Sequence, residues 1–244
     1  MKRTAIVLAA GKGSRMNSRI QKQFMELNGF PLIYYSLQVF EKSRVDDIIL
    51  VTGESEIDYC RTEIVGRYRF QKVKCIVAGG SERCLSVYNG LRAVEDTDIV
   101  LIHDGARPFV TEDIIDRTIQ AAERFGSGVA AMPAKDTIKI ADKDQFVVQT
   151  PARERVWTIQ TPQAFEYRQI YDAYEEVVHQ QVQNVTDDAM VMELVLHKPV
   201  KLVEGSYRNI KVTTAEDMEI ASVFATGYYS RPGAAHSNAT VQTS

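Results

Sequence analysis

The stretch Thr4-Ala5-Ile6-Val7-Leu8-Ala9-Ala10-Gly11-Lys12-Gly13-Ser14-Arg15-Met16 decides the fold class of this chain. Its first part, Thr4–Ala10, is apolar with a β-branched centre, which predicts a strand buried on both faces. A glycine-rich turn follows at once. Its spacing differs from a dinucleotide fingerprint, which needs Gly or Ala at the position of Met16, and from a P-loop, which needs Gly-Lys-Ser or Gly-Lys-Thr. The turn is therefore another kind of loop at the end of a buried strand.

Positive charge gathers in this loop. Lys12, Arg15, Arg19 and Lys22 fall in a segment that holds no Asp or Glu, although the whole chain has 29 Lys and Arg against 32 Asp and Glu. Small residues let backbone N–H groups approach an anion closely. The loop therefore predicts a polyphosphate site, with a solvated basic loop as the structural alternative.

Strand and helix patterns alternate through the residues that follow. This βαβ rhythm predicts an α/β fold, with a mostly parallel sheet flanked by helices and ligand loops at the carboxyl ends of the strands. We expect Ser81 and Thr111 to cap the third and fourth helices. The expected strands are Asp47–Thr52, Val73–Ala78, Ile99–His103 and Gly128–Pro133, and the expected helices are Pro31–Phe40, Glu56–Tyr68, Glu82–Val94 and Thr111–Phe125.

The rhythm changes after Pro133. Thr137–Ala141 and Phe146–Thr150 flank a polar four-residue loop, which predicts a projecting β-hairpin arm at about 137–160. Its unpaired edges need a cover, and a partner subunit is one candidate. We expect one domain over residues 1–227 and a disordered tail over 228–244. The remaining expected elements are helices at Tyr167–Gln180, Asp187–His197 and Thr214–Thr226, and a strand at Val200–Glu204.

Composition narrows the class of protein. The 244 residues are 45% hydrophobic and 25% charged with a net charge of −3, which is typical of a soluble globular protein and argues against nucleic-acid binding. Cys60, Cys75 and Cys84 form no Cys-x-x-Cys pair, so neither a disulfide framework nor a zinc site is indicated. No apolar run has the length of a membrane span. We expect a cytoplasmic protein that binds neither nucleic acid nor membrane.

Several motifs resemble a known family. Ala9–Met16, with Lys22 six residues on, resembles the nucleotidyltransferases that activate sugar and polyol phosphates. Further motifs narrow the resemblance to the 2-C-methyl-D-erythritol 4-phosphate cytidylyltransferases, from about Thr4 to Phe224. These motifs are Gly79–Arg83 with Ser86-Val87, His103–Pro108, Asp136–Lys139, Thr161–Gln163, Thr186–Asp188 and Asn209–Thr213.

The resemblance implies a Rossmann-like nucleotidyltransferase fold and a reaction. CTP and methylerythritol phosphate would give CDP-methylerythritol and pyrophosphate, in a homodimer joined through the β-arm. Magnesium would be held mainly by the CTP phosphates, and no side chain is assigned as a metal ligand. The chemistry suits the residues, because a phosphate monoester is already largely dianionic at neutral pH and needs no strong base. Fixed cations and backbone donors are what such a transfer requires.

The resemblance also assigns roles to residues. Arg15, Lys22, Arg153 and Lys211 are the implied catalytic residues, with Arg153 supplied by the other subunit. The implied nucleotide-binding residues are Ala9, Ala10, Gly11, Gly13, Gly79, Ser81, Ser86, Asp104 and Ala106. The implied polyol-phosphate-binding residues are Asp104, Arg107, Thr137, Arg153 and Lys211.

Structural alternatives stay open for some of these side chains. Arg153 lies in Arg153-Glu154-Arg155, which also suits a solvated ion-pair segment. Asp104 could cap a turn with Gly105, and Lys211 could face solvent on a short strand. His103 is interpreted as a buried structural histidine, because it ends an apolar strand.

Two functional alternatives also stay open. Leu8 and Ser81 replace residues that many family members have, proline and aspartate, and both changes occur in the ribitol 5-phosphate cytidylyltransferases. Ala10 and Gly105-Ala106 favour the methylerythritol group instead. A non-catalytic CTP-binding regulator on the same fold is the second alternative. The presence of Arg15, Lys22 and Lys211 together argues against it, since a mere binder needs no transition-state cations.

Overall fold

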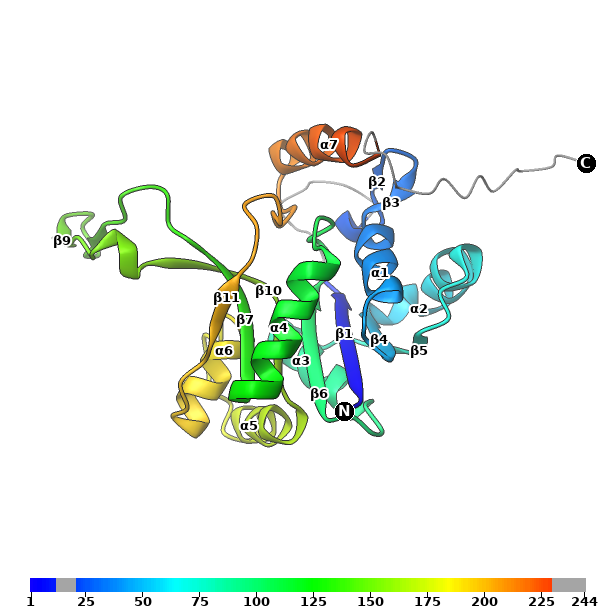
Figure 1. Cartoon of the computed structure of the whole chain (residues 1–244), viewed down its shortest axis with the longest axis horizontal. Helices are drawn as coiled ribbons and strands as arrows, with labels where there is room; N and C mark the ends of the chain where they lie inside the picture. Colours follow the sequence, from blue (N-terminus) through cyan, green and yellow to red (C-terminus); the bar gives the residue numbers. More distant parts are fainter. Residues whose placement is uncertain (12–20, 230–244) are drawn as a thin grey trace, which may run out of the picture.

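A central sheet organises the computed structural model, which describes residues 1–11 and 21–229 (Figure 1). Within these residues the sheet has seven strands in the order β11-β7-β10-β6-β1-β4-β5. The strands are β1 (Arg3–Ala9), β4 (Asp47–Thr52), β5 (Val73–Ala78), β6 (Ile99–Asp104), β7 (Ser127–Pro133), β10 (Trp157–Glu166) and β11 (Leu202–Glu204).

Strand directions confirm the mostly parallel sheet. β1 pairs in parallel with β4 and β6, β4 with β5, and β11 with β7. The chain runs from β1 outward through β4 and β5, then returns to β6 on the other side of β1. This reversal is a topological switch point, where open α/β sheets bind ligands at the carboxyl ends of their strands.

β10 is a strand that the sequence patterns did not predict. It runs antiparallel to both neighbours, pairing with β7 through Trp157–Ile159 and again through Gln163–Phe165, and with β6 through Gln163–Glu166. The register with β7 shifts between Ile159 and Gln163, as at a β-bulge. Trp157 is 37% exposed at the outer end of this strand.

Helices cover both faces of the sheet (Figure 1). α1 (Leu32–Lys42) and α4 (Glu112–Phe125) pack on one face, where Leu37 and Ile115 are fully buried. α3 (Arg83–Arg92), α5 (Tyr167–His179) and α6 (Asp188–Val191) pack on the other, where Val87 and Tyr174 are fully buried. Because both faces are covered, the central strands are apolar throughout rather than alternating.

A smaller cluster closes the sheet's upper end in Figure 1. The short strands β2 (Glu26–Leu27) and β3 (Phe30–Pro31) form a ribbon, and α7 (Ala215–Tyr229) packs against it. α7 extends three residues past the predicted end at Thr226, into the start of the expected tail; residues 230–244 lie outside the described range.

Helix ends test the predicted caps. Thr111 caps α4 as expected, since its hydroxyl accepts the Ile114 N–H at 3.3 Å. The N-cap of α3 is Glu82 rather than Ser81, so that prediction is wrong by one residue. The reason lies in the backbone: Glu82 is still extended, and its carbonyl accepts the Ser86 N–H at 3.0 Å, which places the first helical residue at Arg83.

Two predicted helices have a different hydrogen-bond period. Glu56–Tyr68 contains α2 (Ile57–Tyr59) followed by a π-helix, Cys60–Gly66, and α6 continues into a π-helix at Met192–Leu196. Apolar spacing reports which face is buried, but it does not report whether the backbone bonds reach four or five residues back. Among the described residues, no helix combines the length and the apolar character needed to cross a bilayer.

The arm is present and extends away from the sheet (Figure 1). β8 (Ile140–Ala141) and β9 (Val147–Gln149) pair antiparallel and are shorter than the predicted strands. They have no core to pack against, which limits how far a two-stranded ribbon extends. The apolar side chains of the arm are exposed: Phe146 by 72% and Val148 by 67%.

Candidate active site

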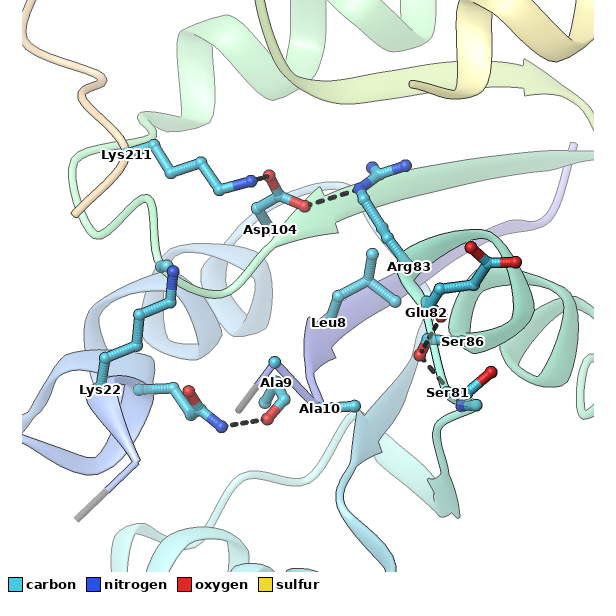
Figure 2. Close-up of a pocket in the computed structure, with 14 residues that line it drawn as sticks. Leu8, Ala9, Ala10, Lys22, Ser81, Glu82, Arg83, Ser86, Asp104 and Lys211 are labelled. Atoms are coloured by element: carbon cyan, nitrogen blue, oxygen red, sulfur yellow. Dashed lines mark hydrogen bonds and ion pairs between the residues drawn. The ribbon is translucent and has the colours of Figure 1, made fainter. Parts of the chain in front are cut away.

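A cavity of about 290 Å³ opens at the carboxyl ends of β1 and β6, beside the loop that follows β5 (Figure 2). This is the switch point of the sheet. Residues predicted from the sequence to bind nucleotide or act in the transfer line it: Ala9, Ala10, Gly11, Lys22, Ser81, Ser86, Asp104, Ala106 and Lys211. Gly13 and Arg15, which the sequence assigns to the same site, lie outside the described residues.

The loop after β5 approaches β1 closely. A Cβ on Gly79 would lie 2.4 Å from the Ala10 Cβ and 2.8 Å from the Ser86 Oγ, so only glycine fits there. The Ser86 hydroxyl accepts the Gly80 N–H and donates to the Glu82 carbonyl, both at 3.0 Å. Gly79 and Ser86 therefore shape the loop that forms one wall of the cavity.

Lys22 opens a 3-10 turn, Lys22–Phe24, that forms another wall. The next side chain, Gln23, is only 2% exposed, and its amide donates to the Ala9 carbonyl at the end of β1. This bond ties the turn to the strand end and keeps Lys22 beside it. Gln23 was not predicted as a site residue, because a single glutamine carries no motif of its own.

Asp104 ends β6 and lies beside Leu8 of β1. One carboxylate oxygen, Oδ1, accepts the Arg83 Nε–H at 3.2 Å, and the other, Oδ2, lies 2.7 Å from the Lys211 Nζ (Figure 2). Burial alone would raise the pKa of Asp104, but the charges of Arg83 and Lys211 outweigh it and hold that pKa well below its ordinary value. Asp104 is thus an ion-paired site residue rather than a turn cap.

Lys211 reaches Asp104 from an irregular segment, so the alternative that placed it on a short strand is wrong. The segment is held at its next residue, where the Val212 N–H donates to the Ala106 carbonyl at 2.8 Å. That bond ties it to the loop after β6. The Lys211 ammonium therefore lies at the cavity through backbone pairing between two loops.

His103 lies fully buried behind Asp104, as predicted. Its Nε2 lies 3.3 Å from the Arg107 carbonyl, which can only accept, so Nε2 carries the proton. Its Nδ1 then accepts from the Thr161 hydroxyl at 3.1 Å, and that hydroxyl accepts the Asp104 N–H at 3.0 Å. Burial lowers the pKa of His103 to about 3, so the imidazole is neutral at pH 7. Its two hydrogen bonds support the loop that follows β6.

A second cavity, also of about 290 Å³, adjoins the first. Arg83, Asp104 and Lys211 line both cavities and thus form the boundary between them. Arg107 lines the second cavity but not the first. Its Nη1 donates to the Asn209 carbonyl at 2.7 Å. Burial lowers the pKa of Arg107, but it keeps a positive charge at neutral pH.

Thr137 and Arg153 lie apart from these cavities. Both are exposed on the arm, and neither lines either cavity of this chain. The Arg153 Nη1 donates only a long bond, 3.4 Å, to the Lys135 carbonyl. Their assignment to the site therefore stays a prediction that depends on a second subunit.

Sequence reasoning assigned no role to Arg83 and Asp188. Arg83 contacts Asp104 and lines both cavities, and both Arg83 Nη atoms lie 2.8 Å from the Asp188 carboxylate oxygens. The signal was available, because both residues fall in motifs that carried the family resemblance. What the motifs could not report is that residues 105 positions apart form one pair.

The switch-point site and the sheet order define an α/β protein of the nucleotidyltransferase fold. The chain belongs to the family described as IspD, 2-C-methyl-D-erythritol 4-phosphate cytidylyltransferase, whose model matches residues 4–226. It is 50% identical over 226 residues to the enzyme of that name from Lachnospira eligens, covering 92% of this chain and 99% of the relative.

Two further comparisons agree. The chain is 49% identical over 218 residues to the Lachnoclostridium phytofermentans enzyme of the same name, covering 89% of this chain and 94% of the relative. The crystal structure of 4-diphosphocytidyl-2C-methyl-D-erythritol synthase from Anaerococcus prevotii superposes with a TM-score of 0.82 at 35% identity, covering 92% of this chain and 96% of that one. The predicted family and fold class are confirmed.

Proposed function

We propose that this chain transfers the cytidylyl group of CTP to 2-C-methyl-D-erythritol 4-phosphate, giving CDP-methylerythritol and pyrophosphate. One observation carries the proposal: two adjacent cavities share the boundary Arg83, Asp104 and Lys211. A nucleotide in the first cavity and a phosphorylated polyol in the second would bring their phosphates together at this boundary. Family membership supports both substrates.

The reaction needs charge stabilisation more than proton transfer. A phosphate oxygen of the polyol phosphate attacks the α-phosphorus of CTP, the bond to the bridging oxygen breaks, and pyrophosphate leaves with the electron pair. Lys22 and Lys211 supply positive charge at the first cavity, and Arg107 supplies it at the second. We assign Arg15 to the triphosphate from the family motif alone. Small side chains line the first cavity at Ala9, Ala10 and Gly11, so a phosphate can approach the backbone there.

Magnesium is the cofactor that the family implies. Within the described residues, no group of three or more His, Cys, Asp or Glu side chains could hold a metal ion. Asp104 offers carboxylate oxygens at the cavity, but Arg83 and Lys211 already engage both. Because both Asp104 oxygens are engaged, the residues present fit an ion bound mainly by CTP phosphate oxygens, with no side chain assigned as its ligand. When bound, the ion neutralises charge on the triphosphate.

The direct test offers two polyol phosphates to the purified chain in parallel. With CTP and magnesium, we expect pyrophosphate release with methylerythritol phosphate and a strong preference for it over ribitol 5-phosphate. Faster turnover of ribitol phosphate would assign the chain to that activity instead. CTP binding without turnover of either polyol phosphate would indicate a regulator.

We further propose that residues 1–227 form one domain that acts as a homodimer through the arm. The exposed apolar side chains of the arm support this, because such a patch on a slender hairpin needs a partner surface. In this proposal Thr137 and Arg153 act at a site that a second subunit completes. Arg suits that role, since its planar fork binds a phosphate with two parallel bonds.

Mixed dimers test the shared site. Lys22→Ala and Arg153→Ala proteins should each be nearly inactive alone. When they are unfolded and refolded together, one site of each mixed dimer collects both intact residues, so random pairing should restore about a quarter of wild-type sites. No recovery, with light scattering that shows dimers, would return Arg153 to the ion-pair interpretation.

A further inference from the structure

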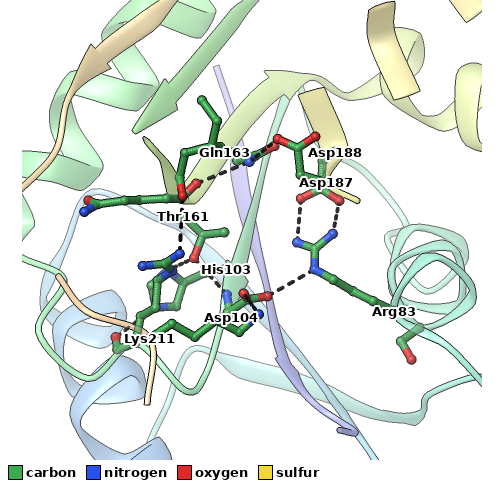
Figure 3. Close-up of polar contacts among 12 residues, drawn as sticks. Arg83, His103, Asp104, Thr161, Gln163, Asp187, Asp188 and Lys211 are labelled. Atoms are coloured by element: carbon green, nitrogen blue, oxygen red, sulfur yellow. Dashed lines mark hydrogen bonds and ion pairs between the residues drawn. The ribbon is translucent and has the colours of Figure 1, made fainter. Parts of the chain in front are cut away.

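The guanidinium of Arg83 donates hydrogen bonds to two carboxylates, those of Asp104 and Asp188 (Figure 3). Its Nη1 and Nη2 each donate to a different oxygen of Asp188 at 2.8 Å, and its Nε donates to the Asp104 Oδ1 at 3.2 Å. The Asp188 pair is the bidentate fork arrangement, which fixes the plane of the guanidinium as well as its position. The direction of the Nε–H toward Asp104 is fixed at the same time.

Asp188 is too deeply buried to touch a substrate. Its side chain is 0% exposed, and it also accepts a hydrogen bond from the hydroxyl of the fully buried Tyr174. Asp188 lines neither cavity. The group through which this carboxylate directly contacts the cavity lining is Arg83. A buried ion pair is also weak evidence for stability, since desolvation offsets much of its attraction.

The Arg83 contact decides which way Asp104 faces. With Oδ1 held by Arg83, Oδ2 points to Lys211 at 2.7 Å. Lys211 is a long side chain on an irregular segment, 37% exposed, and an ammonium can turn freely about its stem. A fixed acceptor gives that ammonium one position, at the boundary of the two cavities.

We propose that Arg83 is a positioning residue for the transfer: locked in place by Asp188 and Tyr174, it orients Asp104, which in turn holds the Lys211 ammonium where the two substrates' phosphates meet. This role rests on the proposed function. Arg83 also begins α3, directly after the loop that walls the first cavity, so the same lock fixes that loop relative to β6.

The decisive variant is Asp188→Asn, which keeps the shape of the side chain but removes the charge that holds the fork. Its matched control is Glu123→Gln. Glu123 accepts two bonds from Arg3, at 3.0 and 2.7 Å, in a partly buried pair near the start of β1, at the opposite end of the sheet from the site. Each protein is assayed for kcat, for the KM of the polyol phosphate, for CTP affinity by calorimetry and for Tm.

We expect Asp188→Asn to lower kcat at least about tenfold while CTP affinity stays within about threefold, because small misplacements of a reacting site carry large rate losses. Glu123→Gln, which breaks a partly buried ion pair away from the site, should leave kcat within about twofold while it lowers Tm. Arg83→Lys, which keeps the charge but loses the fork, should match Asp188→Asn. In an Asp104→Asn background, Asp188→Asn should cost less than about twofold more, since residues acting through one another are not additive.

Other outcomes would overturn the proposal. Equal kcat losses in Asp188→Asn and Glu123→Gln, or a full second loss in the Asp104→Asn background, would leave the Arg83–Asp188 pair a structural feature only. A parallel fall in CTP affinity would place its effect in the nucleotide loop instead. An inactive wild-type chain that binds CTP would refute the proposed function, and the positioning role with it.

Discussion

We call Arg83, His103, Asp104 and Asp188 the floor of the site. The floor and the arm differ in how far one chain supplies the contacts that their side chains need. On the floor, His103 and Asp188 are fully buried, and the structure gives their side chains hydrogen-bond partners within the chain. On the arm, Phe146 and Val148 expose more than two thirds of their surface. The contrast teaches that the floor derives its geometry from internal contacts, whereas the arm presents apolar surface that the described part of this chain leaves uncovered.

The largest effect should come from removing a cavity cation. Lys22→Ala should lower kcat by about 10²–10³, or about 2.7–4 kcal/mol, because a fixed donor matters most when charge develops in the transition state. CTP affinity and Tm should change little. Steady-state kinetics and calorimetry measure both. Lys143→Ala, in the exposed loop of the arm, is the control; an unchanged kcat with weakened CTP binding would make Lys22 a binding residue only.

Breaking the floor should cost stability as well as activity. Asp104→Asn leaves Arg83 and Lys211 without their shared anion. Loss of one partner from a buried pair costs about 3–5 kcal/mol, and because Lys211 is 37% exposed we expect about 2–3 kcal/mol in urea unfolding. The exposed Asp58→Asn, which breaks the surface pair with Arg61, should cost less than about 0.5 kcal/mol. Similar losses for the two variants would contradict the contrast.

Acid should weaken the floor through His103. Its pKa is lowered from 6.5 to about 3 by burial, so the unfolded chain takes up the proton first as the pH falls. The stability contributed by neutral His103 is complete above about pH 6.5 and is lost toward pH 3, at up to about 1.4 kcal/mol per pH unit. His103→Gln should flatten this slope in urea melts, whereas the exposed His179→Gln should retain it. An unchanged slope in His103→Gln would refute the assignment.

The smallest effect on the fold should come from the arm. Val148→Asp should change the free energy of unfolding of the protomer by less than about 0.5 kcal/mol, because the side chain is already 67% exposed. Its effect on association should be large, since a charge is placed in the proposed interface. Sedimentation velocity should show a monomer for Val148→Asp and a dimer for wild type. A dimer that survives would place the subunit contact elsewhere.

Local patterns predicted most of the fold. The β-branched runs of β4 and β5 match their predicted bounds, and β1, β6 and β7 differ by one residue. β10 escaped prediction because Pro162 and two glutamines interrupt it; it is a strand because β6 and β7 both pair with it. Backbone hydrogen bonds to β6 and β7 therefore stabilise a segment whose own residues have a low tendency to form a strand.

The site also contains residues that the sequence predicted and residues that it did not. Residues on the loops after β1, β5 and β6 came together because parallel strands end at one edge of the sheet. The Arg83–Asp188 pair and the turn held by Gln23 could not be read from the sequence, since each depends on a contact between distant segments. Thr137 and Arg153 lie on the arm and line neither cavity of this chain, so their assignment to the site stays a prediction.

The register shift on β10 divides the strand into two parts that differ in how well they tolerate an insertion or deletion. Outside the shift, Trp157–Ile159 leads into the arm; inside it, Gln163–Glu166 is locked between β6 and β7. A bulge can absorb an added or lost residue, whereas a slip inside a paired ladder would turn every side chain to the wrong face. An added or lost residue at the shift would therefore change the reach of the arm, while the part of β10 that lies between β6 and β7 keeps its register.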